Sequence, residues 1–270
     1  MNILVCVKQV PDTTEIKIDP IKNTLIRDGV PSILNPFDGY ALEAAARIKD
    51  QDPNTKIVVV SMGPPQAKKV LKECLAIGAD KAYLVSGRTF GGSDTLATSY
   101  ILTNAIKKLE TMEGKFDAIF CGKQAIDGDT AQVGPEIAEH LGYPQVTYAL
   151  EAEVMEGGSL KVRKETEEGV ELIGIGTPCL ITFTKPAWDH RYPTIKSLVA
   201  ACRTEIPVIS DSEEDMPDID RSMIGLKGSP TRVKKTFVPQ KKAGGIKIKE
   251  DTNSESARKL FQVLSDAAII

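Results

Sequence analysis

Residues 118–141, with the sequence AIFCGKQAIDGDTAQVGPEIAEHL, join a short apolar run to a polar loop and then to a helical pattern. The apolar run at residues 118–121 has the length and composition of a strand that is buried on both faces. The helical pattern covers residues 133–141 and stops at Gly142. A strand, a loop and a helix in this order form the repeating unit of α/β sheets.

The same unit recurs through the first 145 residues. Further buried strands are expected at residues 3–7, 56–60 and 82–85. Helices are expected to begin at Asn35-Pro36, at Pro64-Pro65 and after Asp94, because these residue types cap or start helices. The repeated units predict an α/β fold: a parallel open sheet with helices on both faces.

The pattern changes after the fourth unit. Strands are expected at residues 146–154 and 159–165, and the turn Met155-Glu156-Gly157-Gly158 between them predicts a hairpin. A further strand is expected at residues 180–184. The sheet should therefore carry a hairpin extension.

The last sixty residues have a different composition. Six acidic residues within 210–220 predict a solvated linker. Residues 225–249 contain few apolar side chains, which predicts an extended arm, and Ser254 is expected to cap a last helix. Two parts are therefore expected: an α/β domain at residues 1–209, and a linker, arm and C-terminal helix at residues 210–270.

Composition excludes several classes of function. The chain has 270 residues and a formal net charge of -3, so no basic field indicates nucleic acid binding. No run approaches the roughly 18 apolar residues of a membrane helix, and the amino terminus is typical of a strand rather than a signal peptide. Five cysteines without a C-x-x-C pair favour a reduced, cytoplasmic setting. His140 and His190 lack companions at ligand spacing, so no metal site is expected.

Polar loops follow the first four expected strands, at residues 8–12, 61–65, 87–95 and 122–134. The carboxyl ends of parallel strands share one edge, which is where open sheets bind ligands. Free backbone N–H groups and helix dipoles there suit an anion such as a diphosphate. Turns also need glycine, so these loops alone leave a nucleotide site and plain turns open. Neither G-x-G-x-x-G after the first strand nor G-x-x-x-x-G-K-[ST] occurs, which excludes an ordinary Rossmann loop and a P-loop.

Several of these segments together resemble the beta subunit of electron transfer flavoproteins. The matching motifs are residues 7–12, 35–38, 61–64, 122–130 and 191–195. Residues 225–231 resemble bacterial members of the family. Residues 127–135 resemble the electron-bifurcating version, whereas the AMP-binding version is similar to D-D-D-C-N-Q-T-G.

The resemblance implies a Rossmann-like fold of the adenine nucleotide alpha hydrolase type and a heterodimer with an alpha subunit. It implies FAD between the first and fourth strands, where simpler members hold a structural AMP. In the bifurcating case NADH supplies a hydride, and the electrons go to ferredoxin or flavodoxin and to the FAD of the alpha subunit. That second FAD serves a partner flavin dehydrogenase of the acyl-CoA, enoyl-CoA or lactate type. The chain alone is not expected to turn over.

The resemblance also implies three groups of cofactor contacts. At the adenosine end these are Cys6, Asn35, Pro36, Phe37, Asp38 and Met62. Around the phosphates and ribose they are Gly122, Lys123, Gln124, Ala125, Ile126, Asp127, Gly128, Asp129, Thr130, Ala131, Gln132 and Val133. Toward the flavin ring or the nicotinamide they are Gly91, Ser93, Asp94 and Thr95. Asp127 and Asp129 are equally explained as turn or cap residues, and Cys6 and Cys121 as small core residues.

Partner docking is implied for Glu165, Trp188, Arg191, Tyr192 and Ile195. Residues 184–203 resemble the family's recognition loop, in which Ile195 matches a hydrophobic residue that inserts into the dehydrogenase. Glu165 matches an acidic position that pairs with the mobile flavin domain of the alpha subunit, and the C-terminal helix should pack on that subunit. A packed loop and a solvated strand-end charge are the alternatives for these positions.

Overall fold

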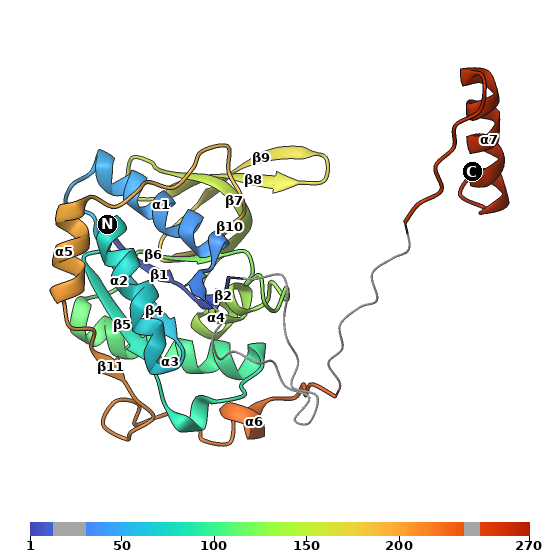
Figure 1. Ribbon diagram of the computed structural model, residues 1–270. Helices are drawn as coiled ribbons and strands as arrows, with labels where there is room; N and C mark the ends of the chain where they lie inside the picture. Colours follow the sequence, from blue (N-terminus) through green and yellow to red (C-terminus); the bar gives the residue numbers. More distant parts are fainter. Residues whose placement is uncertain (13–30, 235–243) are drawn as a thin grey trace. The chain divides into compact units, whose positions relative to one another are not determined.

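The computed structural model describes residues 1–12, 31–234 and 244–270 (Figure 1). The chain separates into two compact units. The first contains the described residues 1–12 and 31–234, and the second contains the described residues 244–270. The sheet and the candidate site belong to the first unit.

A mixed sheet forms the centre of the first unit. Its parallel strands are β1 (Asn2–Cys6), β4 (Lys56–Met62), β5 (Lys81–Val85), β6 (Ala118–Gly122), β10 (Cys179–Phe183) and β11 (Val208–Ile209). Its extension consists of β7 (Gln145–Val154), β8 (Leu160–Thr166) and β9 (Gly169–Ile175). The strand order is β11-β5-β4-β1-β6-β10-β7-β8-β9, in which β7 pairs parallel with β10 and antiparallel with β8. A separate two-stranded sheet joins β2 (Gln9–Pro11) and β3 (Ser32–Leu34).

Helices cover both faces of this sheet (Figure 1). They are α1 (Pro36–Gln51), α2 (Lys68–Ile77), α3 (Thr95–Glu113), α4 (Val133–Leu141) and α5 (Ile195–Arg203), with short 3₁₀ turns η1 (Pro65–Ala67) and η2 (Arg88–Phe90). Ile3 and Val5 of β1 pack with α1 and α2, whereas Leu4 packs with α3 and α4. Since neighbouring side chains of one strand enter opposite cores, both faces must be apolar. The predicted fold class is confirmed.

The carboxyl ends of the central strands lie in register. Cys6 is the partner of Val60 in β4 and of Cys121 in β6. The loops that follow β1, β4 and β6 therefore start from the same edge of the sheet. This is the edge at which the sequence predicts a ligand site.

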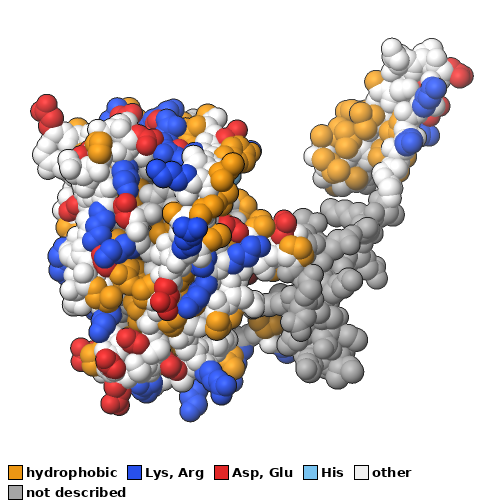
Figure 2. Space-filling view, turned by 60° about the vertical axis from the view of Figure 1, so that its left-hand side comes forward, with side chains coloured by type: hydrophobic (Ala, Val, Ile, Leu, Met, Phe, Trp, Pro, Cys, Tyr) orange, Lys and Arg blue, Asp and Glu red, His pale blue; other side chains and the backbone are white. Residues whose placement is uncertain are grey.

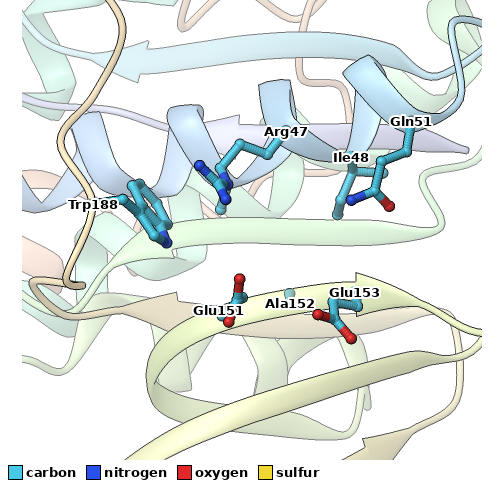
Figure 3. A pocket seen from close by; sticks show the side chains of 8 residues that line it. Arg47, Ile48, Gln51, Glu151, Ala152, Glu153 and Trp188 are labelled. Carbon is cyan, nitrogen blue, oxygen red and sulfur yellow. The ribbon is translucent and has the colours of Figure 1, made fainter.

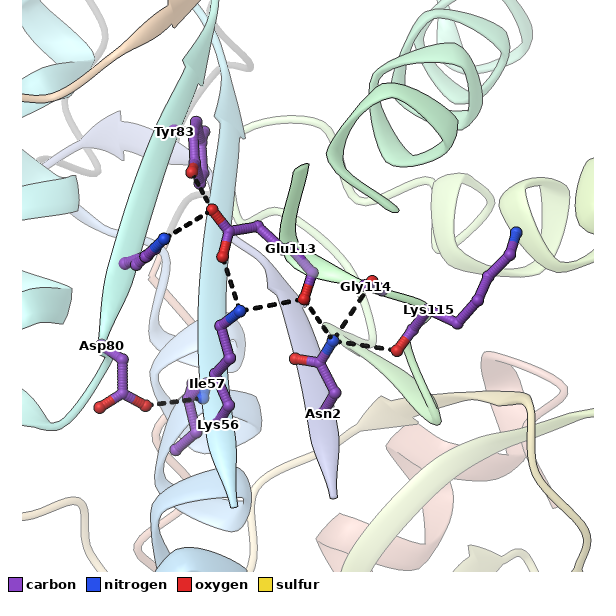
Figure 4. Close-up of polar contacts among 9 residues, drawn as sticks. Asn2, Lys56, Ile57, Asp80, Tyr83, Glu113, Gly114 and Lys115 are labelled. Carbon is purple, nitrogen blue, oxygen red and sulfur yellow. Dashed lines mark hydrogen bonds and ion pairs between the residues drawn. The ribbon is translucent and has the colours of Figure 1, made fainter. Parts of the chain in front are cut away.

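The opposite, amino-terminal edge carries a buried ion network (Figure 4). The Glu113 side chain at the end of α3 is 3% exposed and lies 2.6 Å from Lys56 Nζ and 2.9 Å from Lys81 Nζ. The Tyr83 hydroxyl also donates to it. Burial alone would raise the pKa of Glu113, but the bonds from Lys56, Tyr83 and Lys81 lower it to about 2. Strands β4 and β5 and helix α3 are thus joined at this edge.

Several segments differ from the sequence-based expectation. Strand β9 and helix α5 were not predicted. The expected solvated linker at residues 210–220 instead contributes Met216 and Ile219 to the core beside α3 and α4. Within the expected extended arm, α6 (Gly225–Gly228) is helical, residues 244–249 have no regular structure, and residues 235–243 lie outside the described residues.

The second unit contains helix α7 (Asn253–Asp266). Thr252, not Ser254, caps it, because the Thr252 hydroxyl accepts from Glu255 N while the Glu255 carboxylate accepts from Thr252 N. Apolar side chains gather on one side of this helix (Figure 2), and its Leu260 and Phe261 are exposed. None of the helices in the described ranges has the length and hydropathy needed to cross a membrane.

Candidate functional site

The amino terminus of α1 ties together the loops that follow β1 and β6. Asn35 Nδ2 donates to the backbone O of Gln124 at 2.9 Å, and Asn35 Oδ1 accepts from Ile126 N at 3.2 Å. The sequence indicated Asn35 as a helix cap, but its side chain makes no cap bond; its backbone O accepts from Asp38 N and Gly39 N. Asn35 therefore holds the loop after β6.

Asp38 makes the second tie. Its carboxylate accepts from Lys8 N at 2.7 Å and from Gly122 N at 3.1 Å. A Cβ atom on Gly122 would lie 2.7 Å from the Asp38 backbone N, so only glycine permits this close approach of β6 to α1. One buried side chain thus fixes the starts of both loops.

Asp38 has an unusual ionisation. Burial raises its pKa to about 7, although the hydrogen bonds from Lys8 N and Gly122 N act to lower it. Its carboxyl group therefore changes charge near neutral pH. Because the same group holds both loops, their attachment is coupled to that change.

The acidic side chains of the loop after β6 are paired within the chain. Lys8 Nζ lies 2.6 Å from Asp127 Oδ1, and Gln124 Nε2 donates to Asp129 Oδ1 at 2.7 Å. The backbone N–H groups of Gly128 and Asp129 both donate to Ala125 O. These contacts agree with the interpretation of both aspartates as residues that shape the turn.

Residues 129–132 form the strained end of this loop. Asp129 and Ala131 have φ values of 51° and 54°, in a region that residues other than glycine rarely adopt. No described residue accepts a hydrogen bond from the backbone N–H of Thr130, Ala131 or Gln132. They lie directly before α4, whose amino terminus carries partial positive charge. This arrangement fits an anion such as a diphosphate.

Other predicted adenosine-end residues surround this edge. Pro36 is the first residue of α1, and Met62 is half-buried at the end of β4. Lys123 Nζ lies 5.1 Å from the centre of the Phe37 ring, a cation–π contact. These half-buried residues lie at the same edge as the loops that follow β1 and β6.

Cys6 and Cys121 lie at the carboxyl ends of β1 and β6, beneath the loops that follow these strands. They are direct partners in β1 and β6, and both are buried. The contact with Cys6 and burial raise the pKa of the Cys121 thiol well above its ordinary value. Both features agree with their interpretation as small core residues.

The residues predicted to face the flavin are partly engaged elsewhere. Asp94 caps α3, as predicted, by accepting from Ala97 N at 3.1 Å. Its other carboxylate oxygen accepts from Thr231 N at 2.9 Å, and Asp94 N donates to Ser229 Oγ at 2.9 Å. Residues of the chain's own 225–231 segment therefore form hydrogen bonds with Asp94.

The neighbours of Asp94 differ in whether other parts of the chain contact them. Ser93 Oγ accepts from Gly225 N at 3.1 Å, whereas Gly91 is exposed. Thr95 Oγ1 lies 3.2 Å from Gln132 Oε1, so the start of α3 meets the loop before α4. Thr95 is thus the member of this group that contacts the strained loop.

The predicted docking residues fall into two kinds. Tyr192 and Ile195 are 90% and 83% exposed. Glu165 is exposed near the end of β8. Trp188 and Arg191, in contrast, pack on the side of α1.

The partners of Arg191 were not predicted. They are Glu43 and Asp50, both on α1. A signal for Glu43 existed in the sequence, because it is a carboxylate within the apolar run Ala41-Leu42-Glu43-Ala44. A charge at such a position has to find a partner when the helix packs.

A small pocket lies between α1 and β7, away from these loops (Figure 3). It has a volume of about 30 Å³ and is lined by Arg47, Gln51, Glu151, Glu153 and Trp188, among others. Arg47 is about 16 Å along α1 from the start of that helix, at 1.5 Å per residue. The pocket has room for a water molecule rather than a cofactor.

The fold and this edge define an α/β protein of the Rossmann-like class. The model of the electron transfer flavoprotein domain matches residues 22–213. The electron transfer flavoprotein subunit beta of Megasphaera elsdenii is 54% identical over 259 residues, which cover 95% of this chain and 94% of the relative. The chain therefore belongs to the electron transfer flavoprotein family and functions as a beta-type subunit.

Two further relatives carry names of larger complexes. The caffeyl-CoA reductase-Etf complex subunit CarD of Acetobacterium woodii is 47% identical over 270 residues, the full length of both chains. The acryloyl-CoA reductase electron transfer subunit gamma of Anaerotignum propionicum is 43% identical over 275 residues, again over both full lengths. The predicted family is confirmed by these similarities.

Proposed function

We propose that this chain holds FAD with the loops that follow β1 and β6. The backbone N–H groups of Thr130, Ala131 and Gln132, at the amino terminus of α4, receive the diphosphate. The observation that carries this assignment is the strained loop that leaves those three groups without an acceptor among the described residues. Asn35 and Asp38 act by holding the two loops at a fixed separation.

The choice of FAD over AMP has two supports. Residues 127–135 follow the bifurcating version of the family motif. Relatives of the same length are named as electron transfer subunits of caffeyl-CoA and acryloyl-CoA reductases. A structural AMP in the same loops, in a simple electron shuttle, is the competing function.

When bound, FAD would supply the redox chemistry, namely oxidation of NADH and electron transfer to ferredoxin or flavodoxin and to the alpha-subunit flavin. The chain supplies the loops, the dipole of α4 and the ordered docking surface. The alpha subunit and a flavin dehydrogenase of the acyl-CoA, enoyl-CoA or lactate type complete the assembly. We place the complex in the cytoplasm, where the five free cysteines of the described residues stay reduced.

The nature of the cofactor is tested by extraction from the purified heterodimer. Two FAD molecules and no AMP per heterodimer are expected. One FAD and one AMP would replace the proposal with the simple shuttle. One FAD and no AMP per heterodimer would leave this chain without a nucleotide and would remove the site assignment altogether.

We also propose that Tyr192 and Ile195 contact the dehydrogenase. Both are exposed, and Ile195 starts α5, where Leu198 and Val199 add exposed apolar surface. Glu165 and the apolar side of α7 are assigned to the alpha subunit.

An Ile195→Asp substitution tests this surface. It places a charge in an apolar contact, so the KM for the dehydrogenase should rise about tenfold or more, which equals roughly 1.4 kcal/mol. Met112→Asp, at an equally apolar exposed position on α3, is the control. Equal KM values for both variants would remove Ile195 from the interface.

A further inference from the structure

Arg191 makes an unusually complete set of contacts with α1. Its Nε and Nη2 atoms lie 2.8 Å and 3.0 Å from the two carboxylate oxygens of Glu43. Its Nη1 and Nη2 atoms lie 3.1 Å and 2.6 Å from the oxygens of Asp50. The backbone N of Arg191 also donates to Glu43 at 3.1 Å. One guanidinium thus binds two carboxylates bidentately, a geometry that lysine cannot reproduce.

The two carboxylates are not equivalent. The Glu43 side chain is 5% exposed, whereas the Asp50 side chain is 61% exposed. A buried carboxylate needs a partner, so the Glu43 half of the contact is the strong one. The Asp50 half is open to water and adds less.

Packing extends the same attachment along the chain. The Trp188 ring meets the Tyr40 ring edge-on, with centres 6.2 Å apart, and Arg47 stacks on Trp188 at 5.0 Å. His190 lies 5.1 Å from the Tyr40 ring. Residues 188–191 are therefore held against the side of α1. None of these side chains is free to insert into a partner.

The segment is fixed at its other end as well. Thr194 and Ser197 form a capping box that starts α5. Tyr192 and Ile195 lie between or next to these two attachments. Their exposed side chains are thus presented from a short span that is anchored on both sides.

Helix α1 also connects this span to the cofactor loops. Asp38 and Glu43 are five residues apart on it, which is about 8 Å along the helix axis. The helix that sets the positions of the loops after β1 and β6 therefore also sets the position of the docking span.

We propose that Arg191 is a positioning residue for partner docking, which acts by ordering residues 188–195 and not by touching the partner. This assignment rests on the proposed docking role of Tyr192 and Ile195. It replaces the sequence-based expectation that Arg191 is itself a contact. A span that is ordered before binding saves the complex the free energy of ordering it.

The test uses graded variants of the heterodimer. Arg191→Lys keeps the charge but loses the bidentate geometry, and Asp50→Asn removes only the exposed half. Arg191→Ala is avoided, because it would leave Glu43 buried without a partner. The double variant Glu43→Gln, Arg191→Gln removes both charges, so no buried charge is left without a partner, and it is expected to fold. Arg163→Ala breaks an exposed pair with Glu151 at 3.1 Å and serves as the control.

Two readouts separate positioning from stability. The first is backbone hydrogen exchange in residues 185–195, which should rise in Arg191→Lys and more in the double variant. The second is steady-state transfer to the flavin dehydrogenase, chosen from purified acyl-CoA, enoyl-CoA and lactate enzymes, that the wild-type heterodimer reduces fastest. There KM should rise about threefold for Asp50→Asn and about tenfold for Arg191→Lys, with kcat unchanged.

The outcomes are distinct. Faster exchange at residues 185–195 with an unchanged KM overturns the positioning role, and so does unchanged exchange. A fall in kcat and cofactor content together would show a structural role only, which also overturns it. If the wild-type heterodimer reduces none of the three dehydrogenases, the proposed function itself fails and the inference falls with it.

Discussion

Two buried carboxylates, Asp38 and Glu113, lie at opposite edges of the same sheet, and their pKa values are shifted in opposite directions. At the amino-terminal edge, Glu113 is paired with Lys56 and Lys81. Burial raises its pKa, but the bonds from these partners outweigh that effect and lower the pKa to about 2. At the carboxyl edge, burial raises the pKa of Asp38 to about 7, and its donors are backbone N–H groups. The first edge is arranged for stability, whereas the second carries a destabilising charge.

The difference indicates where the fold tolerates strain. The carboxyl edge also contains the positive φ angles of Asp129 and Ala131. Unfavourable features of this kind persist where surrounding structure holds them and function uses them. Beside Glu113 the positive φ angle falls on Gly114, at 86°, and glycine adopts such an angle without strain. The comparison therefore supports the proposed ligand site at the carboxyl edge and a stabilising role for the amino-terminal edge.

The largest expected effect is on cofactor binding. Thr130→Arg places a long side chain in the cradle proposed for the diphosphate, so the FAD content of the heterodimer should fall about tenfold or more. Thr130 is exposed, so folding should be unaffected. Thr111→Arg, at an exposed position of α3, is the matched control for added charge. Full FAD content in Thr130→Arg, measured by absorbance and extraction, would break the assignment of the carboxyl edge.

A smaller effect is expected at the amino-terminal edge. Glu113→Gln should lower the free energy of unfolding at pH 7 by about 1–3 kcal/mol, the usual value of hydrogen bonds to a charged group. The loss is limited because Lys56 and Lys81 are 35% and 51% exposed and can be hydrated. Urea unfolding measures the change, and the FAD content should stay at the wild-type level. Loss of FAD in this variant would erase the distinction between the edges.

The most subtle prediction concerns pH. Because the folded pKa of Asp38 is raised from 3.8 to about 7, its contribution to stability is complete below pH 3.8 and is lost as pH rises through about 7. For Glu113 the lowered pKa gives the reverse: its contribution is present above pH 4.5 and is lost as pH falls through about 2.

Asp38→Asn sharpens this contrast. Between pH 4 and pH 8 its stability relative to wild type should improve by an amount on the order of 3 kcal/mol, because the wild-type carboxylate ionises at a cost. Urea unfolding at three pH values in this interval gives the slope. A constant difference between the two proteins would mean that Asp38 does not titrate there.

The strands and main helices could be predicted because their apolar runs are short, regular and buried on both faces. Ile3, Val5 and the residues around Ile119, for example, are apolar and buried in the core. Strand β9 escaped prediction because its residues, such as Val170 and Leu172, are mostly exposed and lack a strict alternation. The prediction of a solvated linker at residues 210–220 was wrong because the acidic residues there outnumber the two buried residues, Met216 and Ile219, that attach the segment to the core.

The sequence predicts where the candidate site lies but not how its residues act, and the site itself stays a prediction. The motifs around Asn35 and Asp38 indicate a ligand edge, yet only the folded structure shows that both side chains bind the chain's own backbone. Arg191 illustrates the same limit. Its partners Glu43 and Asp50 are about 140 residues away in sequence, and nothing local to Arg191 identifies them.

The central claim is most directly tested by backbone hydrogen exchange in the deflavinated heterodimer with and without added FAD. FAD should slow exchange in residues 6–12, 35–38 and 122–133, most strongly at the N–H groups of Thr130, Ala131 and Gln132. Exchange around Glu113 should be unchanged. Protection confined to other parts of the chain, or none in residues 122–133, would contradict the account.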